Sequence, residues 1–422
     1  MRIAMVHTPF WGRAGGERQI LRLAIELQKI GHKVEVFTNA VNEETFPDFF
    51  KQLTVNVIQH PMKGKMPKWL APAETYGKSP GAGTEKPSVL RTWMRRRMGR
   101  QFYTIPYQFP CMLCIGRKIP KRFDVVNNHN FPTEWAVFFA KKRLKAPVVW
   151  MCNEPPYWFF IPELRNGLRK LNWPLFELLD RVAVNYIDEI CVLSKVGAGF
   201  VRKAYNRSAK VVRTGVDTEL IHNASGKELR RKYNLENDFI MLFVGGSSYA
   251  RRSELVKALY QLSKSYDNVK LILDVPARQK ETLTKLSEEL GIRNRILFFH
   301  STSDKELAEV YAACDVFVYP SAISPWGLVV TEAMAAAKPV IVSNQVGTSE
   351  IIQDGVNGIV IDRAKPDKIA KQVEVLINNP KLCKNLGENA YEYVKNNLSW
   401  ERYAKNIEIV FQEVISRSKG NP

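Results

Sequence analysis

A repeated alternation of short apolar runs and longer amphipathic segments is the feature that most constrains the fold of this chain. Residues 33–38 and 239–244 are two of the apolar runs, and both are rich in β-branched or aromatic side chains, which favour strands. The segment 17–29 has apolar residues at helical spacing and predicts an amphipathic helix that Gly31 ends in a left-handed conformation. Strands that alternate with helices are typical of parallel sheets, so the sequence predicts an α/β fold with doubly wound sheets.

The alternation runs through two cycles of similar size. The predicted strands are 2–7, 33–38, 55–58, 124–129, 147–150 and 189–193 in the first cycle, and 239–244, 269–273, 296–299, 316–318 and 340–342 in the second. We therefore expect two Rossmann-like domains that face a central cleft, 1–208 and 209–399. A final helix over 400–417 has no strand after it and is free to pack back on the first domain. Tandem α/β domains without a shared site are the alternative, which the similar size of the two sheets disfavours.

Two segments have the spacing of a capping box, in which a Ser and a Glu three residues later cap the start of a helix. They are 225–228 and 303–306. Each therefore predicts the first turn of a helix in the second cycle.

The composition fits a compact intracellular protein. The 422 residues are 45% hydrophobic and 25% charged, which is enough apolar material for two domains. The six cysteines are scattered, and Cys111 and Cys114 form a lone CxxC, so a disulfide scaffold or a zinc site is disfavoured. Neither a signal peptide nor an apolar run long enough to span a bilayer is evident, so we expect a cytoplasmic protein.

The charge is strongly positive and unevenly distributed. The net charge is +20, and residues 61–122 hold 14 Lys and Arg against Glu74 and Glu85, a net of +12. This segment includes Trp93 and Arg95–Arg96–Arg97, and residues 158–161 add apolar side chains that the sequence suggests are exposed. Basic and aromatic residues together suit an anionic membrane surface, so we predict peripheral contact with the cytoplasmic face of a membrane. A solvated basic face is the alternative, and nucleic acid is disfavoured because no nucleic-acid module surrounds these residues.

The segment 324–334 predicts a ligand site in the second cycle. It follows the strand at 316–318, passes through a Pro/Gly turn and begins a helix near Gly327 and Leu328. The carboxyl edge of a parallel sheet is where such folds bind ligands, and a helix N-terminus suits a phosphate. Glu332 lies about 7.5 Å further along that helix, at about 1.5 Å per residue, where its carboxylate can accept hydrogen bonds from a sugar hydroxyl. A helix with one solvated Glu is the alternative.

Polar or small residues follow three other predicted strands. Gly15–Gly16 follow the first strand, where glycine lets the backbone approach a phosphate or sugar closely. His129 ends the strand 124–129, which places it at the mouth of the expected cleft. Gly245–Gly246 and Arg251–Arg252 follow the strand 239–244, and one of the two arginines is expected to meet a diphosphate.

Several reaction classes lack the residues that they need. The chain has no GxGxxG fingerprint with an acidic ribose ligand, which disfavours hydride transfer on a dinucleotide. It also has no P-loop, HExxH, GxSxG or Asp-x-Asp motif and no cluster of His and Cys. We therefore expect an enzyme that needs neither a metal nor a cofactor.

Taken in order, these motifs resemble the family-4 retaining glycosyltransferases, which have the GT-B fold. The resemblance covers nearly the whole chain. It rests on Gly15–Gly16, on His129, on 213–217 (Arg-Thr-Gly-Val-Asp), on the long match over 327–340, and on Gly347–Thr–Ser–Glu350 with 354–358.

The resemblance implies a role for each candidate residue. A nucleotide-sugar, which is a substrate and not a cofactor, would bind the second domain, with Glu332 on the ribose and Gly327–Leu328 at the diphosphate or sugar. Arg251 or Arg252 would neutralise the leaving diphosphate. His129 would contact the donor sugar, and Gly16 would border a glycan or lipid-linked acceptor. The sugar would be transferred with its anomeric configuration kept, by chemistry that depends on positioning and charge stabilisation.

Two departures from the family pattern affect the donor side. Ser324 stands where the family commonly has a Glu that binds sugar hydroxyls, and Gly245–Gly246 stand where the family has Gly-Arg. These departures motivate an alternative, a catalytically weak or inactive GT-B scaffold or regulatory partner. A nucleotide-sugar epimerase of the same fold is a third possibility, but its expected carboxylates and His are not evident.

Overall fold

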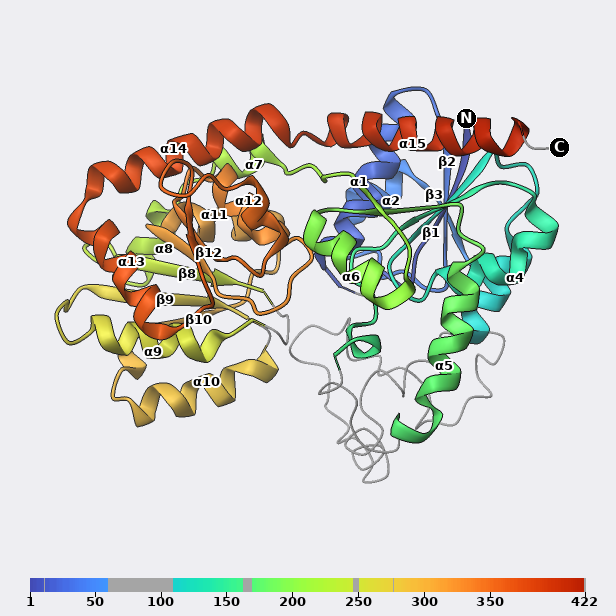
Figure 1. Ribbon diagram of the computed structural model, residues 1–422. Coiled ribbons are helices and arrows are strands. Elements are labelled where there is room, and N and C mark those ends of the chain that lie inside the picture. Colours follow the sequence, from blue (N-terminus) through green and yellow to red (C-terminus); the bar gives the residue numbers. More distant parts are fainter. Residues whose placement is uncertain (11, 60–108, 162–168, 246–249, 276, 421–422) are drawn as a thin grey trace. The chain divides into compact units, whose positions relative to one another are not determined.

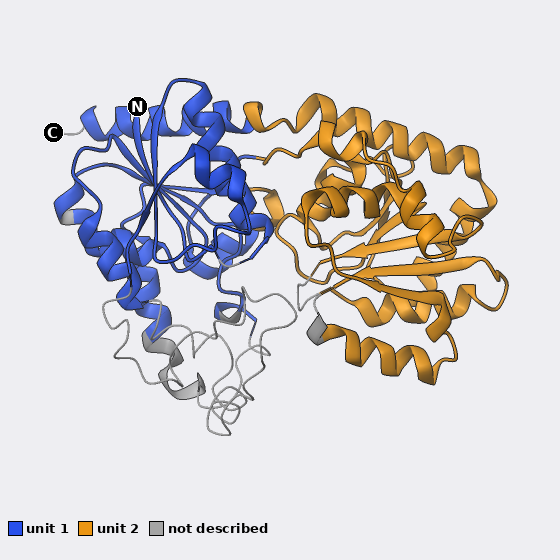
Figure 2. Ribbon diagram, turned by 180° about the vertical axis from the view of Figure 1, so that it is seen from behind, with its two compact units in different colours: residues 1–192, 198–212, 403–422 blue, residues 193–197, 213–402 orange. Residues whose placement is uncertain are grey.

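The computed structural model describes residues 1–10, 12–59, 109–161, 169–245, 250–275 and 277–420. The chain divides into two compact units, each described by itself below (Figure 2). Unit 1 comprises residues 1–192, 198–212 and 403–422, and unit 2 comprises residues 193–197 and 213–402.

The described part of unit 1 is built on a seven-stranded parallel sheet in the order β3-β2-β1-β4-β5-β6-β7. The strands are β1 (Arg2–Val6), β2 (Lys33–Thr38), β3 (Thr54–Val57), β4 (Val125–His129), β5 (Val148–Met151), β6 (Glu189–Val192) and β7 (Lys210–Val211). The helices are α1 (Gly15–Lys29), α2 (Pro47–Gln52), α4 (Glu134–Leu144), α5 (Arg169–Val184), α6 (Lys195–Tyr205, whose first residues belong to unit 2) and α15 (Trp400–Gly420), and residues 109–118 are also helical. The order reverses direction at β1–β4, which is the doubly wound arrangement that the sequence predicts.

The described part of unit 2 has a six-stranded parallel sheet in the order β10-β9-β8-β11-β12-β13. The strands are β8 (Phe239–Val244), β9 (Val269–Asp274), β10 (Ile296–Phe299), β11 (Val316–Tyr319), β12 (Val340–Ser343) and β13 (Ile359–Ile361). The helices are α7 (Thr218–His222), α8 (Lys227–Lys232), α9 (Arg252–Leu262), α10 (Ala277–Glu289), α11 (Asp304–Ala313), α12 (Leu328–Ala335), α13 (Pro366–Asn378) and α14 (Pro380–Asn397). Helices α9, α10 and α13 cover one face of this sheet, and α11, α12 and α14 cover the other (Figure 1).

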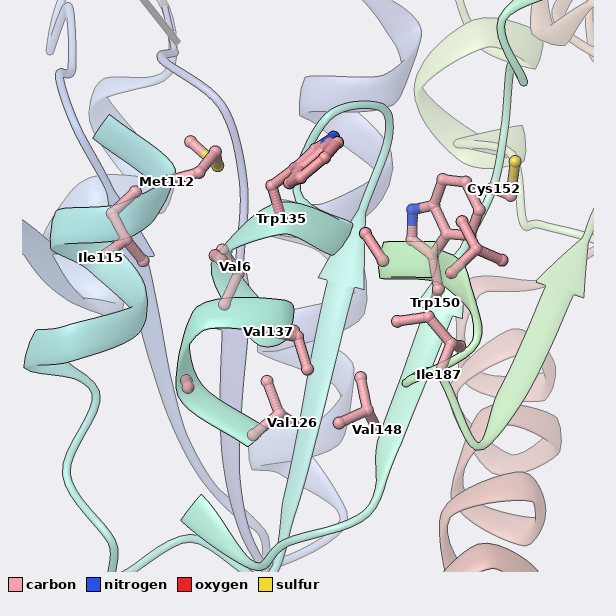
Figure 3. Close-up of a cluster of buried hydrophobic side chains, with 14 of the residues drawn as sticks. Val6, Met112, Ile115, Val126, Trp135, Val137, Val148, Trp150, Cys152 and Ile187 are labelled. Carbon is pink, nitrogen blue, oxygen red and sulfur yellow. The ribbon is translucent and has the colours of Figure 1, made fainter. Parts of the chain in front are cut away.

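The hydrophobic core of unit 1 shows why its strands read as apolar runs. Strand side chains alternate between the two faces, so Val126, Val148 and Trp150 point to one side, toward Trp135 and Val137 of α4 (Figure 3). All five side chains are buried. The 158–161 segment was predicted to be exposed, and this is wrong for Phe159, which is only 4% exposed and joins the same cluster.

The C-terminal helix α15 contributes to unit 1 from Tyr403 onward. Gln19 on α1 donates from Nε2 to the Tyr403 hydroxyl at 2.9 Å, and His32 Nε2 lies 3.0 Å from a Glu408 carboxylate oxygen. Tyr403 is 1% exposed. A buried apolar face with polar contacts at its edges therefore holds this part of α15 against unit 1.

The helix starts differ from expectation at one of the two capping boxes. At α11, the Ser303 hydroxyl accepts from Glu306 N at 3.1 Å, as predicted. At α8 the predicted helix does begin, at Lys227, but the predicted capping box is absent, because Gly226 is the N-cap residue and makes no side-chain cap. Ser225 lies one residue too early, and its hydroxyl accepts only from Lys227 N, at 3.4 Å.

The short edge strands β7 and β13 were not predicted. β7 has two residues and none of them is buried, and β13 (Ile359–Ile361) is an apolar run of only three residues, too short to stand out in the sequence. Among the described helices, none is long and apolar enough to cross a membrane.

Candidate functional site

Three loops at the carboxyl edge of unit 2's sheet form one connected rim. They follow β8, β11 and β12. An antiparallel bridge joins Ala250 to Ser321, and a parallel bridge joins Ser324 to Val346. The loops that carry the predicted donor residues are therefore joined by backbone bridges.

The rim presents the N-terminus of α12. Gly327 is the N-cap residue, with φ 98° and ψ 70°, a left-handed conformation that an L side chain rarely adopts. No side chain caps this end of the helix. Leu328 is the first helical residue. Val330 N already donates to Gly327 O at 2.9 Å, so the N–H groups of Leu328 and Val329 are the ones from which an anion at this helix start can accept hydrogen bonds.

Glu332 lies in the second turn of α12 and is 6% exposed. Its Oε2 accepts a hydrogen bond from the hydroxyl of Tyr311, on α11, at 2.8 Å. The sequence identified Glu332 but missed Tyr311, whose position in an apolar helix gives no sign of a polar partner. The solvated Glu that was the alternative is excluded, since a carboxylate this buried must be held by hydrogen bonds.

Ser324 is also part of the rim, but its backbone carries the contacts. Its carbonyl oxygen accepts from Gly347 N at 2.9 Å, and the side chain is 8% exposed. The Ser324 hydroxyl oxygen lies 3.5 Å from where a Cβ on Gly327 would stand. A short hydroxyl therefore occupies the position beside the α12 N-terminus where a Glu would project further.

The two arginines after β8 differ sharply. Arg252 is the first residue of α9 and is 9% exposed. Its Nη1 donates to Gly245 O at 3.4 Å, and its guanidinium lies over the Phe243 ring, 5.6 Å from the ring centre. Arg251 is exposed. Gly245 adopts φ 132°, and Gly246 lies outside the described residues. Of the two, Arg252 is the one held in place at the rim.

Glu350 has a structural task that the sequence did not reveal. Its two carboxylate oxygens accept from the backbone N–H groups of Lys195 and Val196, at 3.0 and 2.8 Å. All three residues belong to unit 2. Glu350 therefore caps the first turn of α6 with a charge-assisted pair of hydrogen bonds.

In unit 1, His129 ends β4 as predicted, but its side chain is fully buried. Asn127 donates from Nδ2 to Val149 O at 3.0 Å, so its Oδ1 accepts from His129 Nε2 at 2.7 Å. Burial, and secondarily the nearby His7, lower the pKa of His129 well below its ordinary value. The imidazole is therefore neutral, and its Nε2 is engaged with Asn127.

A second histidine at the same sheet edge was missed. His7 follows β1; its Nδ1 donates to Thr8 O at 2.7 Å, which leaves Nε2 to accept from Asn130 Nδ2 at 3.1 Å. Burial lowers the pKa of His7 to about 4. Asn130 Oδ1 in turn accepts from Asn153 Nδ2 at 2.8 Å. His7, Asn130 and Asn153 lie just after β1, β4 and β5, so a comparison of the residues at the strand ends could have identified this group from the sequence.

The glycine pair borders this polar network. Gly15 and Gly16 are the first two residues of α1. A Cβ on Gly16 would lie 2.7 Å from Asn130 Nδ2. A side chain at position 16 would therefore displace the Asn130 amide, which gives the predicted glycine pair a specific neighbour.

The predicted membrane residues Trp93, Arg95, Arg96 and Arg97 lie outside the described residues. Within the described ranges, no group of three or more His, Cys, Asp and Glu side chains is arranged to hold a metal ion.

Comparison with known proteins gives consistent matches along the chain. A family model described as Glycosyltransferase Family 4 matches residues 13–220, and one described as Glycosyl transferases group 1 matches residues 225–393. An uncharacterized glycosyltransferase of Methanocaldococcus jannaschii is 32% identical over 315 residues, which are 70% of this chain and 77% of that protein. An MMP alpha-(1->4)-mannosyltransferase of Mycolicibacterium hassiacum is 23% identical over 436 residues, 99% of each chain.

A solved structure, that of Anabaena HepE in complex with UDP and glucose, has a TM-score of 0.74 to this chain at 18% sequence identity. The match covers 98% of this chain and 100% of that one. This similarity confirms the expected α/β fold with two Rossmann-like parallel-sheet domains.

Proposed function

This chain belongs to the family-4 glycosyltransferases, and from that premise we propose that it transfers a sugar from a nucleotide-sugar to a lipid-linked or membrane-proximal glycan acceptor, with the anomeric configuration retained. The observation that carries the donor assignment is the rim of unit 2, where the uncapped N-terminus of α12 and the buried Glu332 lie on one helix. A diphosphate at the helix start and a ribose at Glu332 match the spacing between them.

Arg252 completes this donor rim. Leaving-group departure places negative charge on the diphosphate, and a cation that is already fixed in position stabilises that charge without reorganisation. Arg252 is held by Gly245 O and the Phe243 ring, whereas Arg251 is exposed. We assign the charge-stabilising role to Arg252 and only a screening role to Arg251.

Unit 1 supplies the sugar and acceptor contacts in this proposal. His129 would meet the donor sugar, and Gly15–Gly16 would border the acceptor. Because Nε2 of His129 is bonded to Asn127, contact with a sugar requires the side chain to exchange that partner for a hydroxyl. The neutral imidazole suits hydrogen bonding and not the delivery of charge, so the leaving phosphate acts as the base.

The sugar specificity is assigned to Ser324. A Glu would accept hydrogen bonds from two sugar hydroxyls, whereas Ser324 offers one short hydroxyl beside Gly327. With Ser324 in place of Glu, the enzyme either uses a donor sugar that makes fewer hydrogen bonds at this position or transfers its sugar more slowly. A scaffold or regulatory partner that binds nucleotide without turnover is the second candidate, and Ser324 is the observation that favours it.

An exposed apolar face on α5 supports a membrane-proximal acceptor. Leu178, Leu179, Val182 and Tyr186 are 59%, 46%, 38% and 37% exposed, and their spacing places them on one side of the helix and its end. The opposite side, with Asp180 and Ala183, is buried. An apolar helix face on a protein of net charge +20 suits contact with an anionic lipid surface.

Nucleotide binding tests the donor assignment. We expect uridine, guanosine or adenosine diphosphate to bind in calorimetry. Glu332→Ala should lower the affinity for the nucleotide about 10- to 100-fold, because a hydrogen bond to a charged group contributes about 1.5–3 kcal/mol. Glu332→Gln keeps an acceptor for Tyr311 and controls for misfolding. Glu388→Ala, an exposed Glu on α14, is the matched control that changes nothing. Equal affinity in wild type and both Glu332 variants contradicts the assignment.

Vesicle sedimentation tests the membrane contact. Replacing Leu178 and Leu179 by Ser removes about 1–2 kcal/mol of apolar burial, so binding to anionic vesicles should fall about tenfold. The matched control is Ile409→Ser, on α15, which is 51% exposed and lies away from this face in sequence. Alanine at Arg95, Arg96 and Arg97, and high salt, should also weaken binding. If the double Leu variant and Ile409→Ser sediment alike, the α5 face has no such role.

A further inference from the structure

A cavity in unit 2 lies at the edge of the sheet opposite the donor rim. Its volume is about 310 Å³, and its lining includes Ser225, Gly226, Ala312 and Ala336. Ala312 precedes β11 and Ala336 precedes β12, so the cavity lies at the amino ends of these strands. The donor loops follow the carboxyl ends of the same two strands. The strands therefore separate the cavity from the proposed donor site.

The cavity is lined by basic side chains. They are His222, Lys227, Arg230 and Lys338, and no carboxylate is among the described residues that line it. Basic residues on an open surface are usually solvated, but here four of them border one hollow. A concave wall of one charge sign concentrates ions of the opposite sign.

Only part of this positive charge is neutralised. Arg230 pairs with Asp315 at 2.6 Å and also donates to Ala313 O at 2.8 Å, so it holds the wall together and carries no excess charge. Lys338 donates to Ala312 O at 2.8 Å, a neutral partner that leaves two of its three N–H groups for other acceptors. Among the described residues, neither Lys227 nor Lys338 has a carboxylate within ion-pair distance. Two uncompensated cations remain.

The walls are rigid before any ligand arrives. Gly226 packs so closely that a Cβ on it would lie 2.3 Å from the backbone of Ala313. The His222 ring stacks on Tyr391 of α14, with 3.8 Å between the ring centres. A preformed site binds its ligand without the entropy loss of ordering a loop.

We propose that this cavity binds a phosphate dianion, either inorganic phosphate or the phosphate group of a small ester, between Lys227 and Lys338. Two lysine ammonium groups match the two negative charges of a phosphate, and the volume leaves room for a few carbon atoms beyond it. The ester would have to be small, because Glu219, Glu228 and Glu309 line the adjoining cavity, which shares Ala224 and Ser225 with this one. This site is independent of the proposed donor site and needs no transferase activity.

Equilibrium dialysis of the full chain against labelled inorganic phosphate tests the proposal. The starting protein is Arg252→Ala, in which the donor rim is weakened as a competing phosphate site. We expect one phosphate per chain, at least tenfold weaker binding in Lys227→Glu, and weaker binding in Lys338→Gln. Lys371→Glu, the same charge change at an exposed residue of α13, should leave binding unaltered.

Glycerol phosphate in place of inorganic phosphate distinguishes the two sources. Tighter binding of the ester with the same dependence on Lys227 assigns the site to esters, and weaker binding assigns it to inorganic phosphate. Lys227 is exposed, so its variant should keep the wild-type melting temperature. The proposal is overturned if no phosphate is retained, or if Lys227→Glu and Lys371→Glu lose it equally.

Discussion

The buried carboxyl pair of unit 1 makes a quantitative prediction about pH and stability. Asp180 on α5 is fully buried and accepts from Trp135 Nε1 at 2.8 Å and from the Tyr205 hydroxyl at 2.9 Å. Burial raises the pKa of Asp180 from 3.8 to about 6. The neighbouring Glu134 is also fully buried, and burial together with the charge of Asp180 raises its pKa well above the ordinary value.

The sign follows from proton binding. Because the folded protein holds the Asp180 proton more tightly than the unfolded chain, this group's contribution is fully present below pH 4 and is lost as the pH rises from about 4 through about 6. A pKa that moves from 3.8 to about 6 corresponds to about 3 kcal/mol, at about 1.4 kcal/mol per pH unit. Asp180→Asn removes the titration and keeps both bonds, since the amide oxygen accepts from Trp135 and the amide N–H donates to Tyr205.

Denaturant unfolding of wild type and Asp180→Asn at a series of pH values measures the effect. His7 and His129, whose pKa values are lowered by burial, oppose Asp180 in wild type. The difference between the two proteins cancels these histidines and leaves Asp180 together with its coupling to Glu134. The variant should gain about 3 kcal/mol relative to wild type between pH 4 and pH 7.5. Asp367→Asn, at an exposed residue of α13, is the control. A difference that stays constant within about 0.5 kcal/mol over this range refutes the reasoning.

Three further variants test the two sites. Gly16→Ala would put a methyl group 2.7 Å from Asn130 Nδ2 and displace it from His7, so the transfer rate should fall at least tenfold with unchanged nucleotide affinity; equal loss of affinity contradicts this. Arg252→Ala should lower the transfer rate about 100-fold and Arg251→Ala far less; equal effects would show that Arg252 is not the charge-stabilising residue. Glu350→Gln should cost about 1–2 kcal/mol of stability in denaturant unfolding and leave nucleotide binding intact, because it weakens only a helix cap.

The sequence was most informative where a residue type favours one backbone conformation. The strand 239–244 was predicted with its observed bounds, and Gly31 has the positive φ expected of it. These features depend on local sterics and on alternating burial, which a sequence displays directly.

The sequence was least informative where the partner of a side chain is distant along the chain. Glu332 was recognised, but its bond to Tyr311 joins two helices. Glu350 matched a family motif, yet its carboxylate caps a helix that begins 155 residues earlier. His129 was placed correctly at a strand end, but its full burial is set by tertiary packing, which no local pattern reports.

Sugar transfer itself tests the central claim most directly. The full chain is incubated with a panel of nucleotide-sugars and a membrane lipid extract, and the product is followed by mass spectrometry and by NMR of its anomeric carbon. We predict that an acceptor gains one sugar as nucleoside diphosphate is released, that the anomeric configuration matches the donor, and that Glu332→Ala reduces the rate about 10- to 100-fold. Nucleotide binding without transfer from any donor, or a product of inverted configuration, would contradict the account.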